Sequence, residues 1–353
     1  MKASEASKSS LRVSQNEVTV SSGFIAPPII AKLWIVYATL PTFMSLPLNT
    51  KLEYGFITGF KTAQMGQKLA DFAKTQDFDS LWVGDHISFP VPIMDCLAQL
   101  ASICGVADGL ILGTGVYLLP LRHPTPVAKQ VATIQSLSGN KLIFGVGVGG
   151  EFPNEYAACG VPLEERGPRL SESIQVLKNL WSGEMVSNEG SFYPFPRVKL
   201  SPPPEPAGGP PIWCGGRAQP ALERCGRFGD GWISYVVSPD QYRAGLETIS
   251  LASEGRKLEH FGTGHLLFAR LADTYEVALD IATISLSDRY GMDFRSAAQR
   301  YCALGRPEDV AEKVKQFINA GVRHIVLDMV GPHEERLEQL TRFSQEVRPL
   351  LSI

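Results

Sequence analysis

The fold is decided by residues 122–150, RHPTPVAKQVATIQSLSGNKLIFGVGVGG, in which an amphipathic stretch is followed by a short apolar run. The stretch 124–138 predicts a helix, and the run 141–147 predicts a buried strand. Gly139 and Asn140 separate the two, as is typical of a turn between such elements. The unit is therefore a building block of an α/β fold with a parallel sheet.

The same alternation continues through the chain from residue 51. Apolar runs predict eight strands, near 52–57, 80–84, 110–116, 141–147, 211–215, 230–235, 265–271 and 323–329. Amphipathic stretches predict helices at 62–76, 124–138, 167–182, 217–227, 239–256, 273–289, 307–320 and 333–350. Because an open doubly wound sheet usually has five or six strands, this eightfold repeat predicts an α/β fold of the (β/α)8 TIM-barrel type.

Two long connections, 148–166 and 183–210, interrupt the pattern. Long loops at the ends of a barrel are the usual places for enclosing a substrate. Six prolines between 202 and 211 predict that the second connection is stiff and extended.

The first fifty residues lack the alternation. A Ser-rich start leads into an apolar stretch from Phe24 to Leu48, which is broken by four prolines and Lys32. We interpret residues 1–50 as an N-terminal extension without a fold of its own, and residues 51–353 as the barrel domain. The alternative is a signal peptide or membrane anchor, but prolines interrupt its uncharged part and no small-residue cleavage site follows.

Composition limits the classes of function. The formal net charge is −3 and no run of Lys or Arg occurs, which argues against nucleic acid as a partner. The six cysteines show no C-x-x-C spacing and the six histidines no H-E-x-x-H, so we expect neither a disulfide framework nor a metal site. We expect a cytoplasmic enzyme with a small-molecule substrate and no membrane attachment.

Candidate catalytic residues follow the predicted strands, since the active site of a (β/α)8 barrel lies at the C-terminal ends of its strands. The second strand ends in Asp85 and His86. His86 can act as a general acid or base, because the pKa of an imidazole lies near neutral pH. Asp85 can orient a ligand or cap a helix.

A glycine-rich loop follows the fourth strand. Residues 145–150 match G-x-G-x-x-G, but Pro153 and Asn154 predict a loop where a dinucleotide site needs a helix to begin. We therefore reject a Rossmann site. Glycines still let the backbone approach a flat ring system, and Glu151 would stand at the rim of that ring as a proton carrier or as a solvated loop residue. The backbone facing the ring would include Gly147, Gly149 and Gly150.

Two other strand ends are unusual. Gly113 interrupts the third apolar run, which predicts a bulge, a tight bend or a place where a ligand contacts the backbone. The fifth strand ends in Cys214, Gly215 and Gly216, and Arg217 begins the next helix, a combination that suits a phosphate group. We interpret Cys214 as a small strand residue rather than a nucleophile.

Seven segments, in this order, resemble the bacterial luciferase-like family: SLWVGDH (80–86), LGTGV (112–116), the opening stretch 122–150, LW (180–181), PIWCGG (211–216), FGDGWI (228–233) and RPEDVAEKVKQFINAGVRHIVLD (306–328). The resemblance implies a (β/α)8 barrel that binds coenzyme F420 or reduced FMN, usually as a homodimer. It also implies that His86 is the active-site histidine and that Asp85 lies beside the coenzyme. Gly115 and Val116 match a bulge, often with a cis peptide bond, behind the coenzyme ring.

The resemblance implies further coenzyme contacts. Glu151 and Asn154 match acidic and polar residues of the fourth loop in deazaflavin members, and Cys214, Gly215 and Gly216 match the segment that meets the coenzyme tail.

The chain departs from the family pattern at two positions. Pro90 replaces the tryptophan of the deazaflavin sugar-phosphate dehydrogenases, which speaks against a sugar phosphate. Val148 replaces the arginine that holds the FMN phosphate in flavin members. We therefore expect hydride transfer between F420 and a small organic substrate, with His86 and Glu151 handling the proton. The alternatives are an FMN-dependent monooxygenase and a non-catalytic partner barrel, which should lack this acid–base pair.

We expect a chain that begins at Met44 to be as active and at least as soluble as the full chain. The sequence from Met44, MSLPLNTKLEYGFITGF, resembles the usual opening of the family, and the residues before it contribute no candidate site residue. Activity, solubility and membrane association of the two chains provide the test. Retention of residues 1–43 in the natural protein, with loss of activity or membrane attachment on truncation, would contradict the expectation.

Overall fold

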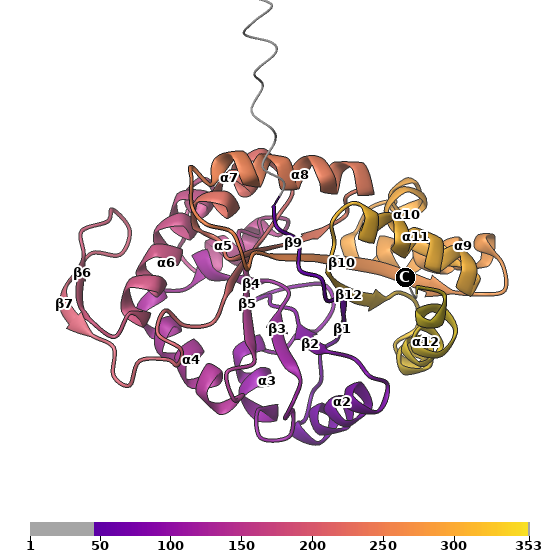
Figure 1. Ribbon diagram of the computed structural model, residues 1–353, viewed down its shortest axis with the longest axis horizontal. Helices are drawn as coiled ribbons and strands as arrows, with labels where there is room; N and C mark the ends of the chain where they lie inside the picture. The colour runs from indigo at the N-terminus through magenta and orange to yellow at the C-terminus, as the bar shows by residue number, and fades with distance from the viewer. Residues whose placement is uncertain (1–45, 352–353) are drawn as a thin grey trace, which may run out of the picture. The chain divides into compact units, whose positions relative to one another are not determined.

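The computed structural model describes residues 46–351, and at its centre is a closed barrel of eight parallel strands (Figure 1). Each barrel strand pairs in parallel with the next, and the last pairs with the first. The strands, in their order around the barrel, are β1 (Glu53–Ile57), β2 (Ser80–Val83), β3 (Ile111–Thr114), β5 (Leu142–Gly147), β8 (Ile212–Gly215), β9 (Gly231–Tyr235), β10 (Gly262–Leu271) and β12 (His324–Met329). The predicted fold and all eight strands are confirmed.

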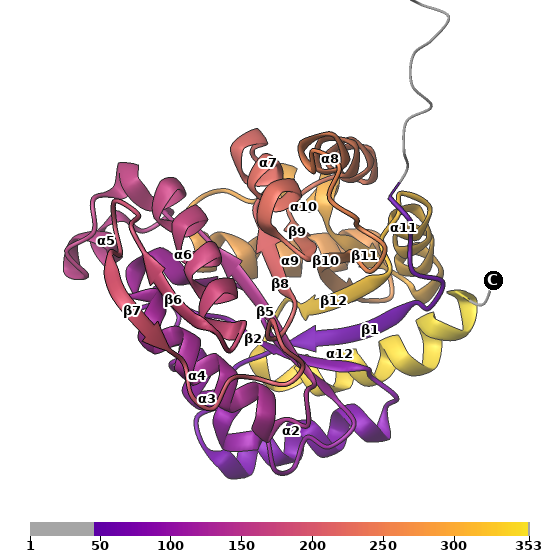
Figure 2. The same cartoon turned by 60° about the vertical axis from the view of Figure 1, so that its left-hand side comes forward.

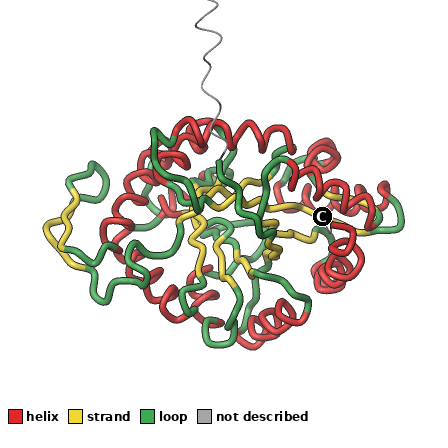
Figure 3. Tube along the Cα trace, viewed as in Figure 1, coloured by secondary structure: helices red, strands yellow, loops and turns green. Residues whose placement is uncertain are grey.

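Helices surround these strands (Figure 3). They are α2 (Ala63–Thr75), α3 (Cys96–Ile103), α4 (Pro124–Leu137), α5 (Pro153–Ala158), α6 (Arg166–Trp181), α7 (Gln219–Phe228), α8 (Pro239–Ala252), α9 (Tyr275–Tyr290), α10 (Arg295–Tyr301), α11 (Pro307–Asn319) and α12 (Arg336–Arg342). Four of the longer helices, α2, α4, α8 and α9, begin at a side-chain cap. Ser238, for example, accepts a hydrogen bond from the backbone N–H of Gln241 and begins α8 with a capping box.

Three short helices were not predicted, namely α3, α5 and α10. The most consequential is α5, because the sequence analysis took Pro153 and Asn154 as evidence for a loop. That inference is wrong: Pro153 occupies the first position of α5, where a proline lacks only an N–H that would have no partner in the helix. The helix predicted at 333–350 is divided into α12 and short turns of 3-10 and π helix.

The connection 183–210 is also different from the prediction. It contains an antiparallel hairpin of β6 (Met185–Asn188) and β7 (Phe195–Lys199), visible beside α6 in Figure 2. The proline-rich part after it forms bends and a turn rather than an extended segment. Two further short strands join the barrel sheet, β4 (Tyr117–Leu118) and β11 (Ala303–Gly305).

Two tryptophans fill the interior of the barrel. The rings of Trp82 on β2 and Trp213 on β8 lie 5.8 Å apart, and at most 5% of either residue is exposed. Neighbouring strands make room for them by carrying glycine. A Cβ atom would lie 2.1–2.5 Å from a tryptophan ring at Gly113, Gly231, Gly262 and Gly264. Gly113 is therefore explained by packing against Trp82, and not by a ligand.

A polar layer closes the barrel at the N-terminal ends of its strands. The hydroxyl of Ser80 lies 2.7 Å from Nε2 of His324 and accepts a hydrogen bond from the Trp82 indole at 2.8 Å. Nδ1 of His324 lies 3.1 Å from the carboxylate of Glu53, and this contact lowers the pKa of that carboxyl. Because Ser80 and His324 are at most 2% exposed, the layer serves stability.

Packing of the barrel begins before the predicted boundary at residue 51. Leu46 belongs to the main hydrophobic core, and the backbone carbonyl of Asn49 accepts a hydrogen bond from Arg323 at 3.0 Å. Most of the predicted N-terminal extension, residues 1–45, lies outside the described residues. Between 46 and 351, no helix has the length and apolar character needed to cross a membrane.

We expect Gly113→Ala to lower the free energy of unfolding by about 1–3 kcal/mol, because the added methyl group would overlap the Trp82 ring. Gly105→Ala is the matched control, since a Cβ there meets no atom within 4 Å. The control should leave stability unchanged or raise it slightly. Urea unfolding of both variants tests the prediction, and equal stability of the two would contradict the packing argument.

Candidate active site

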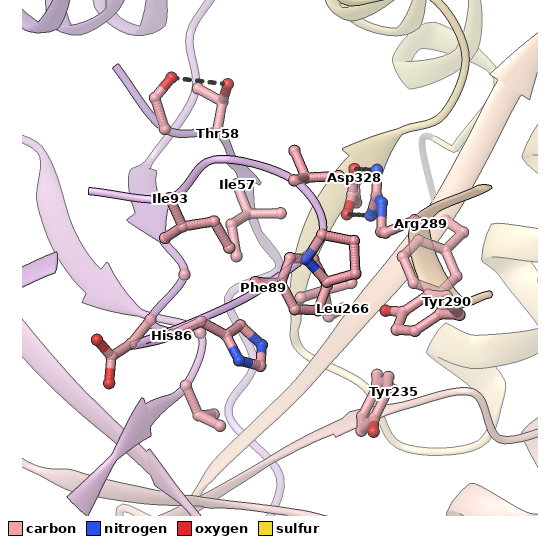
Figure 4. Close-up of a pocket in the computed structure, with 18 of the residues that line it drawn as sticks. Ile57, Thr58, His86, Phe89, Ile93, Tyr235, Leu266, Arg289, Tyr290 and Asp328 are labelled. Atoms are coloured by element: carbon pink, nitrogen blue, oxygen red, sulfur yellow. Dashed lines mark hydrogen bonds and ion pairs between the residues drawn. The ribbon is translucent and has the colours of Figure 1, made fainter. Parts of the chain in front are cut away.

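A large cavity opens at the C-terminal ends of the barrel strands (Figure 4). Its volume is about 1220 Å³, which exceeds the usual range for a single small ligand, about 300–1,000 Å³. Loops after β1, β2, β5, β8 and β12 line it, together with side chains of β9, β10 and α9. The loop after β2 contributes residues 89–94, whereas no residue of the long connection 183–210, which was expected to enclose a substrate, lines the cavity. The volume is sufficient for a flat coenzyme ring and a second molecule.

His86 lies in the cavity wall just after β2, and its ring is held by Glu155. Nδ1 of His86 is 3.0 and 3.2 Å from the two carboxylate oxygens. Glu155 is 1% exposed and also accepts backbone N–H groups of Ile87 at 2.6 Å and Ser88 at 2.7 Å. Phe89 stacks on the imidazole with ring centroids 4.1 Å apart. The contact with Glu155 occupies Nδ1, so Nε2 is the nitrogen that can exchange a proton with a ligand.

Sequence reasoning did not assign Glu155. The candidate chosen from the sequence was Glu151, four residues earlier, because residues 148–166 were predicted to form a loop. In the structure α5 begins at Pro153, and Glu155 is its third residue, buried against the loop that carries His86. Proline followed two residues later by glutamate is a signal for the first turn of a helix and could have indicated the element.

Glu151 lines another part of the cavity. Its side chain is exposed and accepts a hydrogen bond from the Tyr235 hydroxyl at 2.9 Å. Burial, followed by the nearby Glu151 charge, raises the pKa of Tyr235. Tyr235 therefore stays protonated at neutral pH. Glu151 and Tyr235 form a second polar pair, separate from His86 and Glu155.

Asp85 is committed to a structural ion pair. Only 2% of this residue is exposed, and its two carboxylate oxygens accept hydrogen bonds from the two terminal nitrogens of Arg122. One oxygen also accepts the backbone N–H of Leu118 at 2.9 Å. Asp85 thus borders the cavity while its carboxylate fixes the chain after β3.

Another wall of the cavity is built from backbone around Val116. The Gly115–Val116 peptide bond is cis, as the resemblance implied, and both residues line the cavity. A Cβ at Gly147 would lie 2.4 Å from Val116, and one at Gly215 would lie 3.0 Å from it. These glycines therefore allow β5 and β8 to pack closely around Val116.

Some of the other residues that were expected to contact the coenzyme line the cavity, and some do not. Gly149 and Gly216 line the cavity with Gly147 and Gly215. Cys214 is 2% exposed within β8, Asn154 is exposed on α5, and a Cβ at Gly150 would face Arg166. None of these three lines the cavity. In the described part of the chain, no three His, Cys, Asp or Glu side chains are grouped as metal ligands.

The sequence did not reveal the charged groups on the α9 side of the cavity. Arg289 of α9 donates hydrogen bonds to Asp328 of β12 at 2.6 and 3.4 Å, as the dashed lines in Figure 4 show. The charge of Asp328 raises the pKa of Arg289. Burial raises the pKa of the neighbouring Tyr290 to about 12. Arg336, at the start of α12, also lines this side.

Two known proteins show how this chain is related in sequence to others. An F420-dependent glucose-6-phosphate dehydrogenase of Kineococcus radiotolerans is 30% identical over 80% of this chain and 93% of its own length. An uncharacterised protein of Mycobacterium tuberculosis is 31% identical over 49% of this chain, and the match spans 66% of that relative.

A solved F420-dependent secondary alcohol dehydrogenase, in complex with an F420–acetone adduct, has the same fold. Its TM-score is 0.75 at 17% identity, and the alignment covers 86% of this chain and all of the other. The family model described as luciferase-like monooxygenase matches residues 60–345, which include seven of the eight barrel strands and most of the cavity wall. The chain therefore belongs to the luciferase-like monooxygenase family.

Proposed function

We propose that this luciferase-like oxidoreductase transfers a hydride between coenzyme F420 and a small organic substrate, as an alcohol–carbonyl interconversion. The observation that carries the proposal is the His86–Glu155 pair in the wall of a cavity large enough for two ligands. Such a pair can move the proton that accompanies a hydride. Support for the coenzyme comes from the Kineococcus relative, whose name specifies F420, across 80% of this chain.

The residues present fit a flat ring system. Val116 and the backbone of Gly147 and Gly215 form a close-packed wall on one side, and His86 and Phe152 also border the cavity. These residues would hold the coenzyme ring, with Arg217 near Tyr235 available to a charged tail. When bound, F420 supplies a ring carbon that gives or accepts the hydride.

The chain's own residues then handle the proton and exclude water. Nε2 of His86 donates a proton to the substrate oxygen during reduction, or removes one during oxidation. Glu155 fixes the orientation of the ring through Nδ1, so that Nε2 faces the ligand. Apolar side chains such as Phe89 and Leu266 line the adjoining space and keep it poor in water.

Val148 favours F420 over FMN. It is half-buried and lines the cavity, so it offers an apolar side chain where flavin members by resemblance carry a phosphate-binding arginine. The His86–Glu155 pair also speaks against a non-catalytic barrel. By the same resemblance we propose that the protein acts as a homodimer.

We expect F420 to bind at least about tenfold more tightly than FMN, a difference of about 1.4 kcal/mol. Titration of the full chain with each coenzyme, followed by tryptophan fluorescence or the coenzyme absorption band, measures both affinities. Tighter binding of FMN, with oxygen consumption in the presence of reduced flavin, would replace the proposal with a monooxygenase.

We expect His86→Ala to keep coenzyme affinity and to lower turnover by about two to four orders of magnitude, because it removes the proton carrier. Glu155→Gln should keep coenzyme affinity, lower turnover by at least about tenfold and shift the pH profile of kcat, because Nδ1 loses its charged partner.

Glu164→Gln is the matched control, since Glu164 is exposed on the surface and does not line the cavity. It should leave turnover and pH profile unchanged. An unaltered pH profile for Glu155→Gln would remove the His86–Glu155 pair from the mechanism, whatever the effect on rate.

A further inference from the structure

One wall of the cavity carries two guanidinium groups. We call it the arginine wall, and it consists of Thr58, Arg289, Asp328 and Arg336. Asp328 is 8% exposed, and both of its hydrogen bonds to a guanidinium come from Arg289. Of the other carboxylates near these two arginines that line the cavity, Glu335 pairs with Arg270, and Asp288 is exposed.

Arg336 is the group without a charged partner. Its terminal nitrogen donates to the Thr58 hydroxyl at 2.8 Å, and its Nε is buried without a hydrogen-bond partner. Among residues 46–351, no carboxylate lies within 4.0 Å of its guanidinium. Glu335, its neighbour in sequence, pairs with Arg270 instead.

Such a group is unfavourable in the absence of a ligand. Burial lowers the pKa of Arg336, which means that its charged form has lost hydration. A partly buried cation with one neutral hydrogen-bond partner is stabilised strongly by an anion that reaches it. Because Arg336 lines the cavity, that anion can come from a ligand.

The space between His86 and the arginine wall is apolar. Figure 4 shows Ile57, Phe89 and Leu266 lying between His86 on one side and the Arg289–Asp328 pair on the other. The apolar lining continues to the cavity rim, where Met94 is 52% and Ile284 is 64% exposed. Exposed apolar residues gathered at a cavity rim are typical of a ligand-binding site.

We infer that the substrate of this site is an amphiphilic carboxylate, whose carboxylate binds Arg336 while its apolar body spans the cavity toward His86. The inference rests on the proposed function for the reaction, but the recognition of the carboxylate can be measured without any turnover. A bidentate contact suits this assignment, since a guanidinium matches the geometry of a carboxylate.

The test uses the full chain and three probes measured by isothermal titration calorimetry. Octanoate has both the charge and the apolar body, 1-octanol has only the body, and acetate has only the charge. We expect octanoate to bind at least about tenfold more tightly than either of the others. Arg336→Met should reduce octanoate affinity to that of 1-octanol, and Arg336→Lys should retain part of the difference because lysine keeps the charge.

Arg342→Met is the matched control, since Arg342 lies on the same helix, pairs with Glu346 and does not line the cavity. It should bind octanoate like the unmodified chain. Titration of every variant with F420 shows whether the fold and the coenzyme site are intact, independently of the carboxylate.

Three results would overturn the inference. The first is that octanoate binds the unmodified chain no more tightly than 1-octanol does. The second is that Arg336→Met binds octanoate as tightly as the Arg342→Met control. The third is that Arg336→Met loses F420 affinity by the same factor as octanoate affinity, which would assign Arg336 to the coenzyme site. Failure of the unmodified chain to bind F420 would contradict the proposed coenzyme. The octanoate titrations would still test whether Arg336 binds a carboxylate.

Discussion

The rest of the structure depends on how the barrel interior is filled. Trp82 and Trp213 occupy the space that eight strands enclose, and four glycines on neighbouring strands leave room for their rings. With the Ser80–His324 layer beneath them, they close the barrel at the N-terminal ends of the strands. The large cavity accordingly opens at the C-terminal ends of the strands, where loops can vary without loss of the core.

The cavity at that end has two chemically different sides. One is backbone and aliphatic surface around Val116, which suits a flat ring, and the other carries Arg289, Asp328 and Arg336 around an apolar space. His86 lines the same cavity, and a buried carboxylate fixes its orientation. A hydride donor on one side and a substrate on the other would meet beside the group that can exchange the proton. The luciferase-like fold thus provides position, and the chemistry depends on a few side chains.

The elements that could be predicted are those whose sequence pattern reflects burial on both faces. All residues of β2, β5, β8 and β12 are buried, so each strand is mostly apolar without a polar alternation, and their ends were predicted within one residue. Short helices such as α5 have too few turns for a periodic pattern, and the hairpin β6–β7 is half-exposed and weakly apolar. Its placement beside α6 depends on contacts such as those of Glu172 with the backbone of Phe192 and Tyr193.

Local sequence pattern was sufficient to predict the barrel, the end at which the candidate site lies and His86 as an acid–base candidate, because strand order and strand ends follow from that pattern and from the geometry of parallel barrels. The carboxylate that contacts His86 could be identified only from the folded chain. Glu155 is 69 residues away in sequence, and the first turn of α5 directs it inward while Glu151 reaches Tyr235. The same holds for the arginine wall, where Arg336 meets Thr58 across 278 residues. Contacts of this kind arise when closure of the barrel brings distant strand ends together, and no local periodicity encodes them.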